Sequence, residues 1–202
     1  MNEIERALRA SATGLGEPPA EVDTGVLDRV AGEGLLDVAY ATADSPFGPL
    51  TVAATPRGLV RLAYPSLATE AVLSELAVRV SPRILEAPER LDEVRRELDE
   101  YFAGRRQSFD LPLDWSLTDG FTRRVLQATA QIGFGALSTY SDIAERAGSP
   151  RAVRATGNAL GSNPIPVVVP CHRVLRKGGA LGGYTGGIER KRFLLRLEGA
   201  LS

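Results

Sequence analysis

The chain has 202 residues, of which 44% are apolar, with one cysteine, one histidine and a formal net charge of -1. This length and composition fit a globular protein of one or two domains, and a single cysteine and histidine exclude an internal disulfide and a structural zinc site. No apolar run approaches the roughly 18 residues of a membrane helix, so we expect a soluble cytoplasmic protein with no metal, no other cofactor and no membrane partner.

Residues 1–36 show no sustained apolar period, and we expect a peripheral extension with one or two short helices there. Three short β-prone runs follow, separated by turn signals, which predicts an antiparallel meander. These runs are LDVAYAT, LTVAAT and LVRLAY, at residues 36–42, 50–55 and 59–64. Helices are predicted over residues 67–79 and 88–103, with residues 104–120 as the linker to a second domain.

The C-terminal half begins with an amphipathic helix over residues 121–132. Two short helices follow almost without a turn, the first with Ser141 as N-cap and the second with Ser149 as N-cap and Pro150 in its first position. The segment IPVVV, residues 165–169, is then predicted to be a strand. Two closely joined helices between a longer helix and a strand are typical of a helix-turn-helix with a wing.

The second short helix would be the recognition helix, and several of its residues are small. They are Ala152, Ala155, Gly157, Ala159 and Gly161. Such a helix can bring its backbone close to a nucleic-acid groove. The alternative is that small residues only let this helix pack tightly inside the protein.

Charge is unevenly distributed along the chain. Residues 121–202 contain 12 Lys and Arg against 4 Asp and Glu, a net of +8, whereas residues 1–120 contain 12 against 21, a net of -9. A basic half indicates binding to a polyanion such as nucleic acid. A merely solvated basic face accounts for the same count equally well.

The single cysteine and the single histidine are neighbours, Cys171 and His172. A lone cysteine in an apolar segment is usually inert, but a thiol beside a base and a positive charge is activated, and His172 and Arg173 are candidates for these two roles. Neighbouring side chains of a strand point to opposite faces. Contact between the pair therefore requires a bend, which Pro170 favours, or a bridging water.

A histidine base is normally oriented by a carboxylate, and the basic half offers only four acidic residues. One of them, Glu198, lies in the last turn of a predicted helix, where the helix dipole disfavours an acid. Two explanations stay open. Glu198 orients His172, or it pairs with nearby arginines.

The segment NPIPVVVPCHRV, residues 163–174, resembles the active-site segment of the O6-alkylguanine-DNA alkyltransferases. Asn163-Pro164 upstream of the cysteine and the glycine-rich GGYTGG downstream have matching spacing, and the likeness extends over roughly residues 37–199. In that family the cysteine removes an alkyl group from guanine O6 in DNA and keeps it. The resemblance therefore implies an irreversible DNA repair methyltransferase whose molecules each act once.

Carried over position by position, the resemblance implies that Cys171 is the alkyl acceptor and that His172 is a base acting through a water. Glu198 corresponds to the carboxylate that orients the histidine. Asn163 matches the asparagine that joins the recognition helix to the active-site strand. Tyr140 matches the tyrosine that presses on the adjacent phosphate, and a hydrogen bond from Tyr140 to the base would help guanine depart.

The resemblance also implies which residues contact DNA. Arg154 matches the arginine that fills the place of the flipped base, and Arg151 and Gly157 lie with it on the recognition helix. Further matches form the pocket and the loop that closes over the base: Leu160, Pro166, Val174 through its carbonyl, Tyr184, Thr185 and Gly186. The expected partner is double-stranded DNA with O6-alkylguanine, approached from the minor groove by a monomer that flips the base.

The fold prediction is α+β with two domains. Residues 37–115 are expected to form a small antiparallel sheet with helices, similar to ribonuclease H. Residues 116–202 are expected to form a winged helix-turn-helix domain that carries the active-site cysteine, and residues 1–36 lie outside both.

Two other functions fit parts of the pattern. Non-catalytic alkyltransferase-like proteins bind the same lesion, but they replace the cysteine that this chain retains as Cys171. A cysteine hydrolase or acyltransferase using Cys171, His172 and Glu198 needs an oxyanion hole and a direct Cys-His hydrogen bond, which adjacency disfavours. Preference among methyl, ethyl and benzyl adducts, activity on O4-alkylthymine and cooperativity on DNA stay open.

Overall fold

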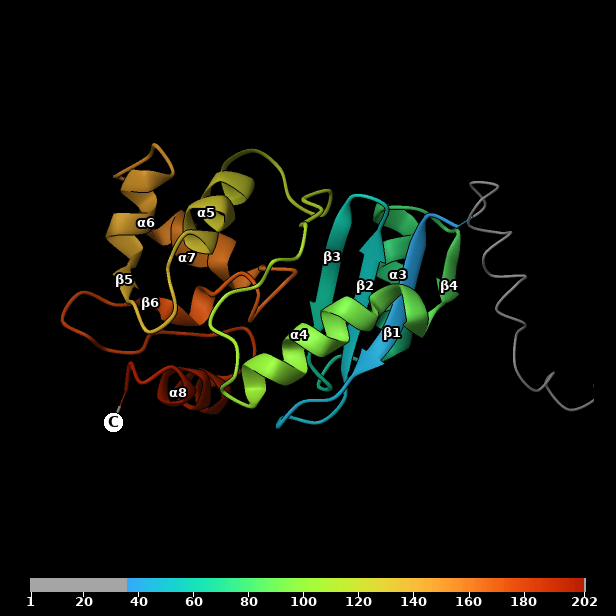
Figure 1. The fold of residues 1–202 in the computed structure, drawn as a ribbon. Coiled ribbons are helices and arrows are strands. Elements are labelled where there is room, and N and C mark those ends of the chain that lie inside the picture. The colour runs from blue at the N-terminus through green and yellow to red at the C-terminus, as the bar shows by residue number, and fades with distance from the viewer. Residues whose placement is uncertain (1–35, 202) are drawn as a thin grey trace, which may run out of the picture. The chain divides into compact units, whose positions relative to one another are not determined.

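The computed structural model describes residues 36–201, and Figure 1 shows their fold. The extension predicted over residues 1–36 lies outside the described residues, except for Leu36. The described chain begins with a sheet and two main helices and continues with a group of helices and a small second sheet, which is the predicted α+β class. Within this range no helix combines the length and the apolar character that crossing a membrane requires.

The first sheet has the strand order β3-β2-β1-β4. β1 (Val38–Ala43), β2 (Leu50–Thr55) and β3 (Gly58–Ala63) pair antiparallel, so the predicted meander is confirmed. β4 (Ile84–Glu86) is absent from the prediction and lies parallel to β1. A helical crossover returns the chain in the parallel sense, and three residues are too few for an alternating pattern to stand out in the sequence.

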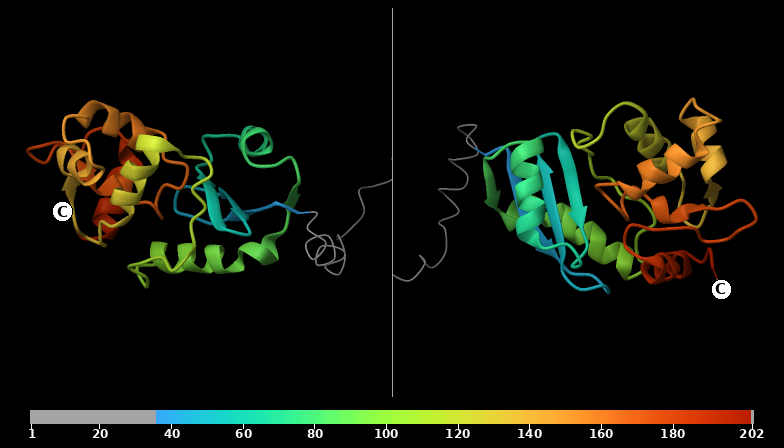
Figure 2. Two further views of the ribbon diagram at one scale, coloured as in Figure 1. Left: turned by 90° about the horizontal axis from the view of Figure 1, so that it is seen from above. Right: turned by 180° about the vertical axis from the view of Figure 1, so that it is seen from behind.

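Two helices cover opposite faces of this sheet, as Figure 2 shows. They are α3 (Thr69–Arg79) and α4 (Asp92–Phe102), and a 3-10 turn, η1 (Pro88–Leu91), precedes α4. Leu76 of α3 and Leu98 of α4 are fully buried, which places the apolar stripe of each helix toward the protein interior. Both predicted helices are confirmed, and the second is divided where Pro88 starts the tighter turn.

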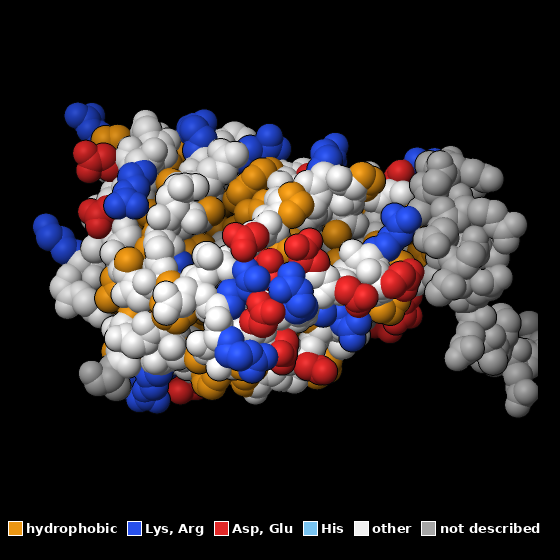
Figure 3. All heavy atoms as spheres, in the orientation of Figure 1, with side chains coloured by type: hydrophobic (Ala, Val, Ile, Leu, Met, Phe, Trp, Pro, Cys, Tyr) orange, Lys and Arg blue, Asp and Glu red, His pale blue; other side chains and the backbone are white. Residues whose placement is uncertain are grey.

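The outer face of α4 carries a mesh of ion pairs, and Figure 3 shows the intermixed charges. Arg96 lies 3.1 Å from Glu100, and Arg106 lies 2.8 Å from the same carboxylate. Arg105 pairs with Asp99 at 2.8 Å. Exposed pairs contribute only about 0–1 kcal/mol each to stability, so their main consequence is that arginine charge here is compensated.

The predicted linker packs against the edge of the sheet. The amide of Leu59 donates to the carbonyl of Pro112 at 2.8 Å, and the amide of Asp114 donates to the carbonyl of Leu59 at 2.9 Å. The Asp114 carboxylate also accepts from the hydroxyl of Thr55 at 2.5 Å. Residues 112–114 therefore extend the sheet beyond β3, and the path from the sheet to the second part of the chain is fixed.

Three helices of the second part contact one another: α5 (Gly120–Ala130), α6 (Tyr140–Arg146) and α7 (Val153–Gly161). The predicted helix-turn-helix is thereby confirmed, but both of its predicted N-caps are wrong. Thr139 caps α6 in place of Ser141, because its hydroxyl accepts from the amide of Asp142 while the Asp142 carboxylate accepts from the amide of Thr139.

The second wrong N-cap is Ser149, which lies in a turn ahead of α7. The amide of Ala152 donates to the carbonyl of Ser149 at 2.9 Å, which closes the turn. Pro150 occupies the second position of this turn, where its fixed φ is favourable. Proline is therefore used here to make the turn, and the helix starts only at Val153.

No strand forms at residues 165–169, where IPVVV predicts one. Three prolines flank or interrupt the segment and cannot donate to a ladder, namely Pro164, Pro166 and Pro170. Val167 adopts a φ of 76°, and the amide of Val169 donates to the carbonyl of Ile165 at 2.9 Å. The chain consequently turns back on itself just before the cysteine.

The second sheet consists of β5 (Ser138–Thr139) and β6 (Val174–Leu175), which pair parallel. β6 follows directly on a 3-10 turn, η2 (Cys171–Arg173), so the cysteine begins a tight turn and does not lie within a strand. The last helix is α8 (Ile188–Leu197), and its residues contact η2.

Gly58→Ala tests the packing of residues 112–114 against β3. Gly58 has a φ of +128°, and a Cβ there would overlap the backbone of Pro112. We expect the free energy of unfolding to fall by more than about 3 kcal/mol, because backbone strain adds to the overlap. Denaturant unfolding measures the loss.

Gly104→Ala is the matched control, since Gly104 has a φ of +72° with open space where a Cβ would lie. It should cost about 1–2 kcal/mol from the left-handed backbone alone. Equal losses for the two variants would contradict the close packing at Gly58.

Candidate active site

Asn163 holds together the turn that precedes Cys171. Its Nδ2 donates to the carbonyl of Val169 at 2.8 Å and to Sγ of Cys171 at 3.2 Å, and its Oδ1 accepts from the amide of Ile165 at 3.0 Å. These bonds hold a turn in which Val167 has a positive φ, a conformation that costs a β-branched residue about 1–3 kcal/mol. The buried amide thus fixes the position of the sulfur.

Burial keeps the Cys171 thiol protonated at neutral pH. Loss of solvation raises the pKa of this thiol to about 11, while the hydrogen bond from Asn163 and the charge of Lys191 act to lower it. The charge of Lys191 thus acts on the sulfur, whereas Arg173, the cation expected from the sequence, is bonded to Glu198. A nucleophilic role requires that the proton leave as the sulfur reacts.

His172 faces Glu198 and makes no hydrogen bond to Cys171 in the described structure. Its Nε2 lies 2.9 Å from Oε1 of Glu198, and both side chains are fully buried. An ionised carboxylate only accepts hydrogen bonds, which assigns the hydrogen to Nε2 and leaves a lone pair on Nδ1. Nδ1 has no partner among the described residues. Burial lowers the pKa of His172 below 6.5, so the ring is neutral at pH 7.

Glu198 ends α8 and accepts hydrogen bonds from several parts of the chain. The hydroxyl of Tyr101 donates to Oε1 at 2.6 Å, and Arg173 donates through Nε at 2.8 Å and Nη2 at 2.9 Å. The amide of Gly135 adds a bond of 3.4 Å to Oε2. Burial alone would raise the pKa of Glu198, but the bonds from His172, Arg173 and Tyr101 lower it to about 2.

The two roles that the sequence left open for Glu198 were to orient His172 and to pair with arginines, and the structure shows both contacts. The carboxylate binds the ring of His172, and it also pairs with Arg173, which donates in addition to the carbonyl of Ile132. The arginine compensates the carboxylate charge that the helix dipole disfavours. Because that charge is already compensated, the histidine can stay neutral beside it.

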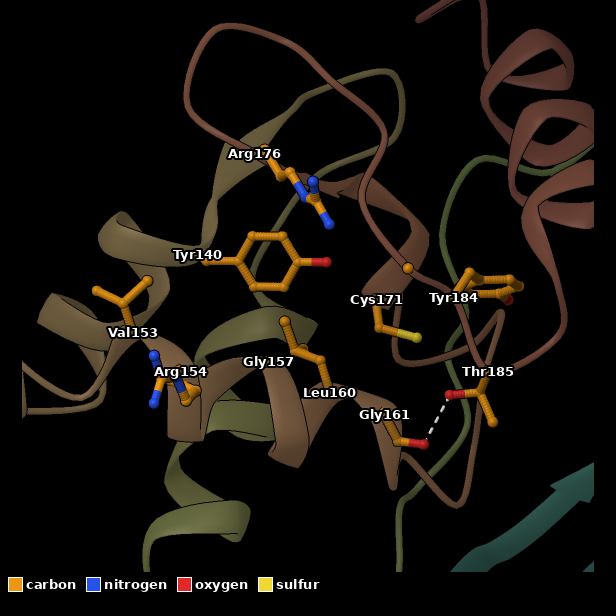
Figure 4. A pocket seen from close by; sticks show the side chains of 11 residues that line it. Tyr140, Val153, Arg154, Gly157, Leu160, Gly161, Cys171, Arg176, Tyr184 and Thr185 are labelled. Carbon is orange, nitrogen blue, oxygen red and sulfur yellow. Dashed lines mark hydrogen bonds between the residues drawn. The ribbon is translucent and has the colours of Figure 1, made fainter.

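A pocket of about 480 Å³ opens beside the cysteine. In Figure 4 Cys171 and Tyr184 lie on one side of it, Tyr140 and Arg154 lie toward the other, and Arg176 reaches in above Tyr140. The lining includes these residues that the sequence singles out: Tyr140, Arg154, Gly157, Leu160, Cys171, Tyr184 and Thr185. The volume is within the range of small-ligand sites, and one cysteine sulfur faces it.

Four predicted lesion contacts lie outside this lining. Arg151 is exposed in the turn before α7, Pro166 is buried in the turn before the cysteine, and Gly186 is buried behind the pocket wall. Val174 is fully buried, and its carbonyl accepts from Nζ of Lys191 at 2.6 Å. A carbonyl has two lone pairs, so this bond leaves one for another donor.

Tyr140 is the first residue of α6, and its ring faces the glycine-rich loop. Gly182 has a φ of +67°, and a Cβ there would lie 2.7 Å from the Tyr140 hydroxyl, so a larger residue would strain the backbone and displace the ring. Burial raises the pKa of Tyr140, which keeps its hydroxyl protonated at neutral pH. The hydroxyl of Thr185 in the same loop donates to the carbonyl of Gly161 at 2.8 Å and ties the loop to α7.

Basic side chains near the pocket carry charge that no acid among the described residues compensates. Within residues 120–201 the ion pairs are those of His172 and Arg173 with Glu198 and of Arg192 with Glu189. Arg154 and Arg176 line the pocket, and Arg151 is exposed one turn away. In contrast to the mesh on α4, this surface is suited to an anion.

Sequence reasoning missed several residues of the site, among them Tyr101, Lys191 and Arg176. Tyr101 lies 97 residues before Glu198, and no local pattern connects them. Lys191 is fully buried, and its signal is that it shares the apolar face of α8 with Leu194 and Leu195 at helical spacing. Arg176 gives no signal beyond its basic neighbourhood.

Two family models match the chain. Residues 38–115 match "6-O-methylguanine DNA methyltransferase, ribonuclease-like domain", and residues 120–200 match "6-O-methylguanine DNA methyltransferase, DNA binding domain". The methylated-DNA–protein-cysteine methyltransferase of Methanosarcina acetivorans is 38% identical over 161 residues, which are 80% of this chain and 98% of that protein. The constitutive enzyme of that name from Bacillus subtilis is 41% identical over 79% of this chain and 94% of its own length.

Solved structures give the same comparison in three dimensions. The crystal structure of the O6-methylguanine methyltransferase of Mycobacterium tuberculosis is similar at a TM-score of 0.68 and 39% identity, over 82% of this chain and 94% of that one. A crystal structure of the M. tuberculosis protein OGT in complex with DNA is similar at a TM-score of 0.67 and 40% identity, over 79% and 92% of the two chains.

Tyr101→Phe tests the bond from α4 to the Glu198 carboxylate. The substitution keeps the ring and removes the donor of the 2.6 Å hydrogen bond. We expect the free energy of unfolding to fall by about 1.5–3 kcal/mol, the range for hydrogen bonds to charged groups. Tyr40→Phe, which removes a 3.4 Å bond to Glu86 on the surface, should change it by less than about 0.5 kcal/mol. A loss no larger than that of the control would mean that Tyr101 contributes packing alone.

Proposed function

Because the chain belongs to the 6-O-methylguanine DNA methyltransferase family, we propose that it repairs DNA by transferring the methyl group of O6-methylguanine to its own Cys171. The observation that carries this proposal is a buried thiol at the wall of an open pocket, with His172 and Glu198 packed behind it. The thioether product offers water no easy leaving group, so each molecule acts once.

We propose that α7 approaches DNA from the minor groove. Its small residues bring the backbone close to the groove, and the uncompensated Arg151 and Arg154 supply charge for the phosphates. Arg154 fills the space that the flipped nucleotide leaves in the stack. Exposed Val153, beside it on the helix, adds an apolar contact of the kind that minor-groove proteins use.

The flipped guanine enters the pocket beside Cys171. Rotating a nucleotide out of the duplex costs a few kcal/mol, and a damaged pair resists least. Leu160 and Tyr184 contribute apolar walls, and Thr185 lies on the loop that covers the base. The lone pair left on the Val174 carbonyl is the acceptor for the guanine amino group, and Pro166 supports this wall from within.

The transfer is an in-line displacement at carbon. Sγ of Cys171 donates an electron pair to the methyl carbon, and the bond from that carbon to guanine O6 breaks with its electron pair on the base. The hydroxyl of Tyr140 donates a hydrogen bond to the departing base, for which its raised pKa keeps it protonated. Tyr140 also presses on the adjacent phosphate and helps hold the nucleotide out of the stack.

The thiol proton leaves through His172. Nδ1 accepts the thiol proton through a bridging water, while the N–H at Nε2 keeps its hydrogen bond to Glu198. The positive charge that develops on the ring is stabilised by that carboxylate. The departing guanine anion takes up a proton from water, and His172 releases the thiol proton to solvent, so the overall reaction exchanges a methyl group for a proton. Asn163 holds the sulfur in place as this occurs.

The proposed domain division is residues 37–115 for the ribonuclease-like part and residues 116–202 for the part that binds DNA and reacts. We propose that the protein acts as a monomer, since one chain supplies every group that the mechanism uses and no second copy is needed to complete the site. Action on cellular DNA with a reduced thiol assigns the protein to the cytoplasm.

The two alternative functions fit less well. A non-catalytic lesion binder has no need of a thiol held by Asn163 beside a histidine base, and this chain has both. A hydrolase needs a direct hydrogen bond between His172 and the sulfur, and in the described structure the remaining ring nitrogen, Nδ1, makes none. Turnover of an acyl substrate in excess over protein would favour the hydrolase.

Mass spectrometry of the intact protein tests the reaction. After mixing with duplex DNA that contains O6-methylguanine, the protein should gain one methyl group, located on Cys171 by peptide mapping. Methyl transfer should stop at one equivalent per protein. An unchanged mass would refute the proposal.

Cys171→Ala is the control for that experiment. It should bind the lesion duplex with an affinity within about threefold of the unreacted protein, because binding rests on Arg154, Tyr140 and the phosphate contacts. It should leave the lesion in place. Removal of the methyl group by this variant would rule out the cysteine as acceptor.

The pH dependence of transfer follows from the pKa of His172. Burial lowers this pKa from its ordinary value, so as the pH falls from 8 the neutral base should persist, and the rate should stay level, to a lower pH than an exposed histidine would allow. Further acidification protonates the ring and should lower the rate. Single-turnover rates across this range measure the profile, and His172→Gln should be about a hundredfold slower with no such fall. A rate that rises on acidification would exclude the histidine as base.

A further inference from the structure

Tyr184, on the pocket wall, is held from behind by a residue of the first part of the chain. Tyr64 follows directly on β3, and its hydroxyl lies 2.7 Å from the hydroxyl of Tyr184, 120 residues later in the sequence. The two rings meet edge to face with centroids 6.3 Å apart. Tyr64 is 5% exposed and does not line the pocket, so it touches the base only through Tyr184.

Tyr64 also fixes the loop at Gly186, two residues after Tyr184. A Cβ at Gly186 would lie 2.6 Å from Cε2 of Tyr64 and 2.7 Å from Cε1 of Tyr184, so the backbone fits between the two rings without room to spare. Arg190 lies over the Tyr64 ring at 4.7 Å from its centroid and donates to the carbonyl of Gly186 at 2.7 Å. The loop is thus clamped between a ring and a guanidinium.

Tyr64 itself has little freedom to move. Phe47, from the turn between β1 and β2, packs edge to face on the Tyr64 ring at 5.8 Å. Phe47 in turn packs on Phe102 of α4 at 5.8 Å and on Phe193 of α8 at 5.0 Å. This aromatic cluster joins the sheet, α4 and α8, and Tyr64 transmits its position to the pocket wall.

The pocket wall is also close to the proposed base. The ring of Tyr184 lies 6.4 Å from that of His172, and Figure 4 shows it beside Cys171. A shift of Tyr184 would therefore change both the depth of the space next to the sulfur and the surroundings of the histidine. A wall displaced by about 1 Å can cost up to a hundredfold in rate, because the reacting atoms lose alignment.

We propose that Tyr64 is the positioning residue that sets, through Tyr184 and Gly186, how large an alkyl group the pocket aligns with Cys171. The proposal rests on the proposed methyltransferase function. It assigns to the ribonuclease-like part a role in substrate selectivity: a rigid wall aligns the small methyl group, and a loosened wall favours a bulkier group such as benzyl.

Single-turnover transfer from duplexes with O6-methylguanine or O6-benzylguanine tests this role. Tyr64→Leu removes the ring, and methyl transfer should slow by about tenfold while benzyl transfer slows by less than about threefold. Tyr64→Phe removes only the hydroxyl and should change the ratio of the two rates in the same direction by a smaller factor. Tyr40→Phe, a tyrosine of the same sheet that touches no part of the loop, should leave both rates unchanged.

A double-mutant cycle separates the contact from general loss of structure. Each of the substitutions Tyr64→Phe and Tyr184→Phe removes the one hydrogen bond between the two hydroxyls. The double variant should therefore transfer the methyl group at the rate of the slower single variant. Multiplicative effects would overturn the proposed coupling. So would equal slowing of methyl and benzyl transfer in Tyr64→Leu, which is the signature of a merely destabilised protein.

Hydrogen exchange distinguishes failure of this inference from failure of the proposed function. Amides of residues 182–187 should exchange faster in free Tyr64→Phe than in the parent protein or in Tyr40→Phe. If the parent protein accepts no alkyl group, the proposed function fails. Faster amide exchange in Tyr64→Phe would even then show that Tyr64 holds the loop in place. If the parent reacts and Tyr64→Phe matches Tyr40→Phe in exchange and in both rates, only this inference is overturned.

Discussion

The buried carboxylate of Glu198 is the interaction on which the rest of the site depends. An ionised carboxylate at this depth is stable only when its charge and lone pairs are compensated, and donors from Tyr101, His172 and Arg173 meet that need together. Because α4 supplies one of them, the sheet part and the reactive part of the chain share one polar core. Each donor is coupled to the others, since the loss of any leaves the same charge less compensated.

Burial also assigns the protonation states around the sulfur. Glu198 is ionised, His172 is neutral, and the Cys171 thiol, with a pKa of about 11, is thiolate in only about one molecule in ten thousand at pH 7. A protein that spends its nucleophile once gains from such a resting state. Stray electrophiles find an unreactive thiol, whereas in the proposed reaction a base seated in the pocket meets the sulfur together with the proposed route for its proton.

Much of this was predictable where the signal is local. The meander, the helix-turn-helix and the cysteine segment follow from residue patterns of ten or twenty residues, and the misplaced acid at the end of α8 pointed to Glu198. Contacts between distant segments were not predictable, because no local pattern near Tyr101 indicates its hydrogen bond to Glu198, and none near Tyr64 indicates its hydrogen bond to Tyr184. The strand predicted for IPVVV was wrong, because its β-branched residues favour a strand but the neighbouring prolines impose a turn.

The position of Glu198 along the chain has a consequence for biosynthesis. A ribosome releases Tyr101, Cys171, His172 and Arg173 before it releases Glu198, because chains grow from the N-terminus. Until α8 emerges, the histidine has no carboxylate to orient it and the arginine has no partner. In the proposed mechanism, chemical competence is therefore acquired only once α8 has emerged, and a chain interrupted before α8 carries a cysteine without the histidine–carboxylate pair that the reaction uses.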